Sequence, residues 1–193
     1  MCFCCCRRNM GNSGSKPPLT GLAKVVDADW LVRQKWYVIA CTPTPFDPEP
    51  HDAVERYSWT DETKTNFKVT YKFRPRSSDA KVDTMFQDGK TTANVNEWKV
   101  RPRIFGGALH VIMWLPYLIL ECPAGGSSAQ QGSKPFVVGY PDRSLIWIMS
   151  LQKEMADSEY KETLDRCENE YGYDRAMLDK LWKVPFKNDI PDE

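Results

Sequence analysis

Four cysteines within the first six residues form the most reactive cluster of the sequence. They are Cys2, Cys4, Cys5 and Cys6, and two arginines follow them directly. Thiols beside an aromatic residue and two cations, near a flexible chain end, suit S-palmitoylation. One acyl chain holds a protein at a bilayer only weakly, whereas two give stable anchoring, and basic side chains add contact with anionic lipid. We therefore expect lipidation of these cysteines and peripheral attachment to the cytoplasmic side of a membrane.

Two other interpretations of this segment stay open, a thiolate metal site and a tail without function. Adjacent cysteines do not easily wrap a tetrahedral zinc ion without further ligands. A conditional signal follows, because Met10 and Gly11 begin an N-myristoylation pattern if translation starts at Met10.

The remaining reactive residues do not form a recognisable catalytic or metal-binding pattern. His51 and His110 are the two histidines, and neither has a partner at metal-ligand spacing. Cys41, Cys122 and Cys167 are an odd number of scattered thiols, which indicates free, buried cysteines in a reducing compartment. We expect no enzyme activity, no cofactor and no bound metal.

Charge and hydropathy narrow the classes of partner. Lys plus Arg equals Asp plus Glu at 26 each, so no global field draws the chain to nucleic acid. The longest apolar run, 104–120, is interrupted by glycines and a proline and is shorter than the roughly 20 residues of a spanning helix. The N-terminus has cysteine and arginine where a secretory signal would be apolar, which predicts retention on the cytosolic side.

The elements that position these residues are mainly strands. Apolar residues alternate in eight short runs separated by turn-forming residues. The runs are 35–41, 53–59, 66–74, 81–94, 97–104, 110–121, 135–140 and 144–150. Short connections make consecutive strands antiparallel, and such a sheet can remove its edges by closing into an up-and-down barrel, with a sandwich as the competing arrangement.

A helix follows the strands. Tyr160, Leu164, Cys167 and Tyr171 recur at helical spacing with charged residues between them. The sequence therefore predicts an all-β, eight-stranded antiparallel barrel with a C-terminal α-helix, from about 158 to 171, packed outside it. Three regions are expected: a disordered tail over 1–22, a barrel domain over 23–187 and a C-terminal tail over 188–193. Residues 124–133, rich in Gly, Ser and Gln, are expected to form an exposed loop.

Several of these segments resemble the lipocalins, in particular bacterial outer-membrane and plant temperature-induced lipocalins. Residues 35–40, KWYVIA, are similar to the family's first strand, and residues 137–150, VVGYPDRSLIWIMS, to its last two strands. The resemblance implies a barrel that binds a small hydrophobic ligand such as a fatty acid, phospholipid or isoprenoid, with a role in transport, scavenging or the stress response.

On the third run, Phe67, Val69, Tyr71 and Phe73 share one face because strand side chains alternate. From the residues alone they could fill a solid core, whereas the resemblance implies that they line a lumen. Val38, Ala40, Tyr117 and Ile119 are expected to line the same space. Arg56 either points inward toward a ligand carboxylate or lies on the outer face paired with an acid.

The base of the barrel is expected to depart from the family. In lipocalins a tryptophan at the position of Trp36 closes the base, and an arginine from the end of the last strand stacks on it. That arginine is Leu151 here, with Lys153 two positions later. Either an apolar contact from Leu151 or a cation–π contact from Lys153 would replace it.

Two further functions remain as alternatives. The first is a filled barrel that acts as a non-catalytic protein-interaction module through its outer surface and the 124–133 loop. The second, a minor one, is a lipocalin-fold enzyme of the xanthophyll-cycle type, whose accessory cysteine-rich and acidic regions this sequence lacks. The sequence leaves the oligomeric state open.

Overall fold

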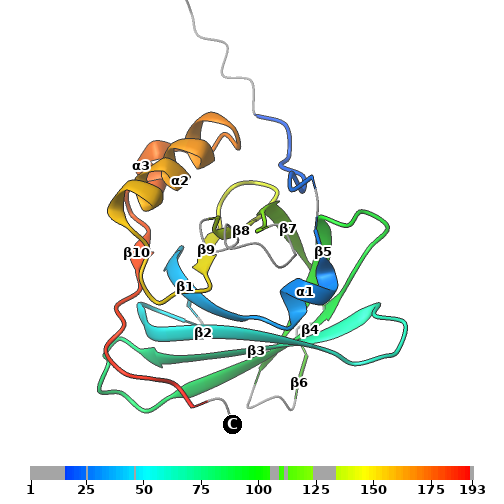
Figure 1. Cartoon of the computed structure of the whole chain (residues 1–193), viewed down its shortest axis with the longest axis horizontal. Helices are drawn as coiled ribbons and strands as arrows, with labels where there is room; N and C mark the ends of the chain where they lie inside the picture. Colours follow the sequence, from blue (N-terminus) through cyan, green and yellow to red (C-terminus); the bar gives the residue numbers. More distant parts are fainter. Residues whose placement is uncertain are drawn as a thin grey trace, which may run out of the picture.

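The protein forms a closed antiparallel β-barrel in its computed structural model (Figure 1). The structure describes residues 16–24, 26–45, 47–104, 109–110, 113–123 and 134–191. The barrel strands are β1 (Lys35–Cys41), β2 (Pro50–Trp59), β3 (Asn66–Pro75), β4 (Asp83–Lys90), β5 (Glu97–Ile104), β7 (Leu115–Glu121), β8 (Phe136–Gly139) and β9 (Ile146–Ser150). Each pairs with the next, and β9 pairs with β1 to close the barrel. The predicted eight-stranded barrel is confirmed.

Two short strands extend the sheet. β6 (Leu109–His110) pairs with β5, and β10 (Trp182–Lys183) adds to the β1 edge. Strand formation follows the alternation of residue types, which is clearest in β3, where buried and partly exposed side chains alternate from Asn66 to Phe73. This alternation places one row of each strand inside the barrel.

The described part of the chain has three helices outside the strands: α1 (Ala28–Val32), α2 (Asp157–Asn169) and α3 (Arg175–Leu178). α2 is the predicted C-terminal helix, and it packs against the outside of the barrel beside β1 and β9 (Figure 1). Its buried face includes Tyr160, Leu164 and Cys167, as expected. None of the described helices is long and apolar enough to cross a membrane.

Two hydrophobic clusters stabilise this arrangement. The interior cluster lies inside the barrel and is built mainly from inward-facing side chains of β1, β2, β3, β5, β7 and β8. The outer cluster lies between the barrel wall and the helices α2 and α3. It includes Leu118, Val137 and Ile148 from the wall and Leu178 from α3. Strands β7, β8 and β9 therefore have two buried faces, which explains their nearly continuous apolar sequences.

Both ends of the described chain pack on the barrel, which extends the folded domain beyond the predicted 23–187. Leu19 is buried in the outer cluster, and its amide donates to the carbonyl of Pro141 at 2.8 Å. At the other end Ile190 is buried. Leu19 and Ile190 therefore pack on the folded domain although they fall in the predicted tails, because single apolar residues in polar segments dock on the wall. The cysteine cluster and the 124–133 loop lie outside the described residues.

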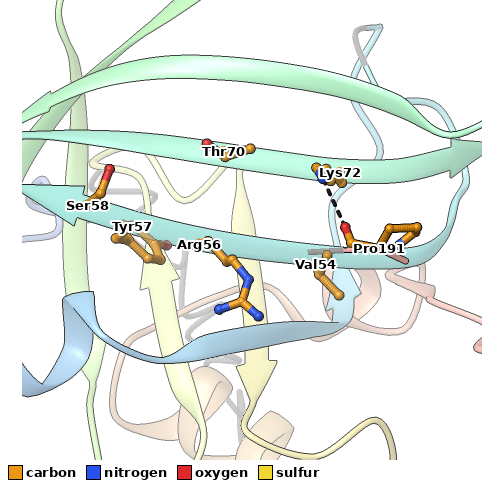
Figure 2. A pocket seen from close by; sticks show the side chains of 7 residues that line it. All are labelled: Val54, Arg56, Tyr57, Ser58, Thr70, Lys72 and Pro191. Carbon is orange, nitrogen blue, oxygen red and sulfur yellow. Dashed lines mark hydrogen bonds between the residues drawn. The ribbon is translucent and has the colours of Figure 1, made fainter. Parts of the chain in front are cut away.

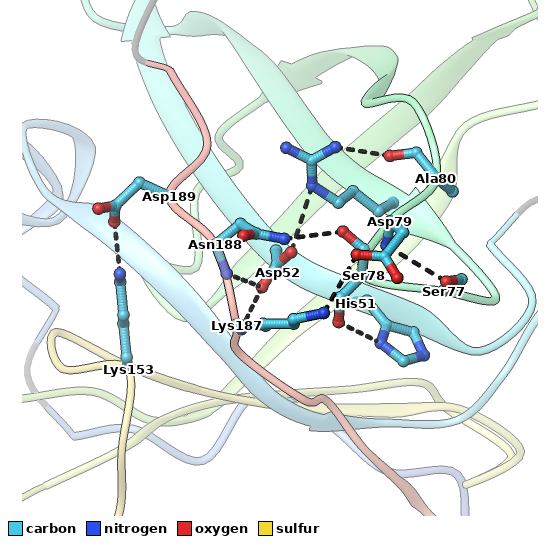
Figure 3. A network of polar contacts seen from close by, with 11 residues as sticks. His51, Asp52, Ser77, Ser78, Asp79, Ala80, Lys153, Lys187, Asn188 and Asp189 are labelled. Atoms are coloured by element: carbon cyan, nitrogen blue, oxygen red, sulfur yellow. Dashed lines mark hydrogen bonds and ion pairs between the residues drawn. The ribbon is translucent and has the colours of Figure 1, made fainter.

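A polar network holds residues 184–191, which we call the C-terminal segment, against β2 and β3 (Figure 3). Asp52 is buried, and its Oδ1 accepts hydrogen bonds from the backbone amides of Lys187 at 2.6 Å and Asn188 at 3.0 Å. Its Oδ2 forms an ion pair with Nε of Arg74 at 3.2 Å. The Asn188 side chain also donates to the carbonyl of Ser78 at 2.8 Å. One carboxylate therefore joins the C-terminal segment to two strands.

Candidate functional site

Most of the residues expected to line the lumen lie inside the barrel. The interior cluster contains Trp36, Val38, Phe67, Val69, Tyr71, Phe73, Tyr117 and Ile119. All of them are at least nine-tenths buried. The structure therefore brings the predicted aromatic row of β3 together with the predicted residues of β1 and β7. Their role in ligand binding stays a prediction.

Ala40 is the exception, because it belongs to the outer cluster under the helices. The pairing of β1 with β9 shifts register between Val38 and Ala40, which marks a β-bulge. A bulge adds one residue to a strand and reverses the alternation beyond it. The expectation that Ala40 faces the lumen is therefore wrong, and Cys41 takes the inward position instead.

Arg56 lies on the outer face, so of its two predicted orientations the outward one holds and its place among the lumen residues is wrong. Its neighbours Glu55 and Tyr57 lie opposite the interior residues Tyr71 and Val69 of β3, and directly paired residues share a face. Arg56 instead lines a hollow of about 230 Å³ on the outside of β2 and β3. The hollow is bordered by Val54, Arg56, Tyr57, Ser58, Thr70, Lys72 and Pro191 (Figure 2).

The base of the barrel is closed by α1. The indole Nε1 of Trp36 donates to the carbonyl of Leu31 at 3.1 Å, and the ring of Trp30 lies edge-on to that of Trp36, with centroids 5.9 Å apart. Lys153 pairs with Asp189 of the C-terminal segment (Figure 3), so the expected cation–π contact with Trp36 is wrong. The reason is that β9 ends at Ser150 and Lys153 lies beyond it. Leu151 packs against the interior cluster.

Aromatic rings fill the half of the interior next to this base. Trp36 and Phe136 have centroids 4.8 Å apart, as do Phe67 and Trp98, and Tyr57 and Tyr117 connect the two pairs. At Gly89, opposite Phe67, an added Cβ would lie 2.0 Å from the Phe67 ring. The glycine therefore makes room for this ring, and the base half of the barrel is a packed aromatic core.

The interior is less closely packed on the side formed by β4, β5 and β7. Met85 and Gln87 pair with the interior residues Tyr71 and Val69, and Pro102 pairs with Gln87, so all three share the interior face. Leu115 alternates with Tyr117 on β7 and also faces inward. We call these four residues, Met85, Gln87, Pro102 and Leu115, the accessible side of the interior, because each is only half-buried.

A group of acids and tyrosines lies next to the accessible side, because Tyr71 pairs with Met85 and Tyr117 lies two positions from Leu115 on β7. The Tyr57 hydroxyl donates to the carboxylate of Glu55 and lies 2.6 Å from the hydroxyl of Tyr117. The carboxylate of Asp47, from the loop between β1 and β2, accepts from Thr44 and, at 3.4 Å, from the Tyr71 hydroxyl. We call Asp47, Glu55, Tyr57, Tyr71 and Tyr117 the acid–tyrosine group. Each of its members is buried.

Burial raises the pKa values of the acid–tyrosine group. Loss of hydration raises the pKa of Glu55 to about 7 and that of Asp47 to about 6, and the negative charge of Asp47 also raises the pKa of Glu55. Burial raises the pKa of Tyr57 and of Tyr117, and the nearby Glu55 raises both further. When Glu55 and Asp47 are ionised, this part of the interior carries negative charge.

Sequence reasoning missed these acids and the accessible side. The sequence contained one signal for Glu55. Strand alternation puts it on the same face as Tyr57, a large aromatic residue that can pack in the barrel interior. Asp47 follows a proline-rich loop with no periodicity, so its burial had no sequence signal. The four residues of the accessible side have mixed chemistry, and only the strand register places them together.

The remaining reactive residues show no catalytic arrangement in the described part of the chain. Cys41 and Cys167 are buried free thiols and Cys122 is a half-buried one. Burial raises the pKa of all three, which disfavours the reactive thiolate. Among the residues that the structure describes, no group of three or more His, Cys, Asp or Glu side chains could hold a metal ion.

Comparison with known proteins agrees with this architecture. Residues 32–183 match the model of the lipocalin-like domain. Temperature-induced lipocalin-1 of Arabidopsis thaliana is 25% identical over 164 residues, which cover 82% of this chain and 78% of that protein. Insecticyanin of the tobacco hornworm Manduca sexta superposes with a TM-score of 0.59 at 14% identity, covering 89% of this chain and 86% of its own. Lobster apocrustacyanin A1 gives a TM-score of 0.53 at 13% identity, covering 89% and 92%. The chain belongs to the lipocalin family.

Proposed function

We propose that this lipocalin binds one small hydrophobic ligand inside its barrel, on the accessible side of the interior. The family and the fold support binding of this kind, and our proposal assigns the protein no catalytic step. The observation that carries this proposal is a difference in solvent exposure between residues that all face the barrel interior. Val69 and Ile119 have no exposed surface, whereas Met85, Pro102 and Leu115 are half-buried although they face inward.

The side chains there suit an apolar ligand. Ligand sites are lined mainly by hydrophobic and aromatic groups, with a few polar groups that set orientation. Met85, Leu115 and Val100 supply an apolar wall, and Gln87 adds an amide. The aromatic core at the base limits how deep a ligand reaches, so the ligand enters from the opposite end of the barrel.

The test compares two tryptophan variants by titration with a neutral fluorescent lipid probe. Leu115→Trp fills the accessible side and abolishes saturable binding, with a loss of stability below about 1 kcal/mol. Val69→Trp is the matched control in the packed interior, where overpacking costs about 1 to 3 kcal/mol. If Leu115→Trp destabilises the fold as much as Val69→Trp and the wild type binds no probe, the barrel is filled and the interaction-module alternative holds.

We also propose that the protein acts at a membrane surface, through acylation of Cys2, Cys4, Cys5 and Cys6. The support is the composition of the segment, four thiols beside two arginines. A carrier held at a bilayer meets apolar ligands at high local concentration. Ligand transport or scavenging there is consistent with similarity to a temperature-induced lipocalin.

A further inference from the structure

In the described part of the chain, two buried carboxylates of the barrel interior have no cationic partner. Among the described residues the buried acids are Asp47, Asp52 and Glu55. Asp52 has Arg74 as its ion-pair partner, whereas neither Glu55 nor Asp47 has a lysine or arginine partner in the described part of the chain. The segments 105–108, 111–112 and 124–133 contain no lysine or arginine in their sequences. These three segments therefore bring no lysine or arginine to the two acids.

Among the described residues, none of the titratable groups that surround Glu55 is a cation. Tyr57 lies on the same strand, Tyr71 on β3, Tyr117 on β7, Asp47 on the β1–β2 loop and Cys41 on β1. The negative charge of Glu55 raises the pKa of four of them: Cys41, Tyr57, Tyr71 and Tyr117. Each of the five is neutral or anionic, so the field inside the barrel favours positive charge.

This field selects between ligand head groups. A carboxylate or phosphate placed beside Glu55 and Asp47 would be a third like charge in a buried site, which is strongly unfavourable. An ammonium group is of opposite charge and has three N–H donors for carboxylate oxygens, and such charge-assisted hydrogen bonds are about twice as strong as neutral ones. Tyr57 and Tyr71 already donate to the two carboxylates and hold them in place.

The position of the pair also fits a ligand with one apolar and one polar end. Glu55 retains 6% of its surface, Tyr117 8% and Val100 6%, whereas Val38 and Phe136 retain none. Glu55 and Tyr117 thus keep part of the small accessible surface of the buried interior, and half-buried residues of the accessible side adjoin their group, since Met85 pairs with Tyr71 and Leu115 lies two positions from Tyr117. Building on the proposed function, we propose that the ligand is an apolar amine whose cationic head binds Glu55 and Asp47.

The experiment compares decylamine, decanol and decanoate, which share one chain length, in displacing a neutral fluorescent probe at pH 7.4. Wild-type protein binds decylamine about tenfold or more tighter than decanoate, because one charge-assisted hydrogen bond is of that size. Glu55→Gln lowers the affinity for decylamine about tenfold and changes that for decanol by less than about twofold. Asp47→Asn is the second test variant, and Glu62→Gln, an exposed acid, is the control.

Calorimetry adds a readout that does not depend on affinity. If the cationic head binds ionised Glu55, decylamine binding at pH 7 releases a proton from the fraction that is protonated, and the heat changes with the ionisation enthalpy of the buffer. Decanol binding releases none. Decanoate binding as tight as decylamine, or equal selectivity in wild type and both variants, would overturn this inference and leave the proposed function intact. Failure of all three probes to bind would overturn the proposed function itself.

Discussion

The hydroxyl of Tyr57 donates a hydrogen bond to the carboxylate of Glu55 inside the barrel, two positions apart on β2. Both residues face inward because of the β2–β3 register, and Tyr117 extends the contact to β7. A mainly apolar barrel interior thus contains hydrogen bonds that connect β2 with β7. The first prediction concerns what this arrangement does to stability.

Stability should fall as the pH rises from 5 to 8. Burial raises the pKa of Glu55 to about 7 in the folded state from its ordinary value of 4.5, so between these values the folded state binds more protons than the unfolded state. The contribution of Glu55 to the free energy of unfolding is therefore fully present below pH 4.5 and is lost as the pH rises through 7. Urea denaturation should show a loss of about 1 to 3 kcal/mol over this range in wild type and a smaller loss in Glu55→Gln. Identical pH slopes in the two proteins would contradict this account.

The second prediction concerns the C-terminal segment. Asp52→Asn removes the charge that pairs with Arg74 and weakens the bonds to the amides of Lys187 and Asn188. Breaking a buried ion pair costs about 3 to 5 kcal/mol, and Arg74 is partly exposed, so we expect the lower end of this range. Hydrogen exchange should become faster at 187–190.

Asp79→Asn is its matched control, because Asp79 also contacts the segment, through Lys187 at 3.1 Å, but is exposed. Exposed ion pairs contribute about 0 to 1 kcal/mol. If both variants destabilise the fold equally, the network of Figure 3 does not depend on burial.

The third prediction separates two ways of closing the barrel base. Trp36→Phe loses the hydrogen bond to Leu31 and leaves a cavity, and should cost about 2 to 4 kcal/mol in thermal or urea denaturation. Lys153→Ala should cost less than about 1 kcal/mol, because Lys153 forms a surface ion pair with Asp189. A large effect of Lys153→Ala would indicate that it supports Trp36 after all.

The fourth prediction concerns membrane attachment. Changing Cys2, Cys4, Cys5 and Cys6 together to Ser should move the protein from the membrane to the soluble fraction, because thioester-linked chains are lost. Cys41→Ser is the control, since this thiol is buried in the barrel. If the quadruple variant stays on the membrane and hydroxylamine does not release the wild type, acylation is not the anchor.

The sequence predicted which segments form strands. It predicted only in part which side chains of a strand face the barrel interior. The regular alternation of β3 fixed the positions of Phe67 and Tyr71 correctly. The bulge that turns Ala40 outward leaves no mark in the residue types, since Val38, Ile39 and Ala40 are all apolar. On β2 the alternation was ambiguous, because Glu55 and Arg56 are both charged, and only pairing with β3 shows which one faces inward.

The parts of the site that depend on distant segments were not predictable. Lys153 pairs with a residue 36 positions later, and the C-terminal segment returns to β2, more than 130 positions earlier in the chain. Such contacts follow from the closed barrel and from the path of the chain after α3, and no local pattern encodes them. The interior position of Asp47 likewise depends on the loop between β1 and β2.

Native mass spectrometry of the protein purified from its own source tests the central claim most directly. The account predicts a single co-purifying apolar molecule per chain, lost on denaturation and absent from the Leu115→Trp variant expressed in the same source. Wild-type protein that carries no small molecule, and that binds neither decylamine nor decanol when these are added, would contradict it.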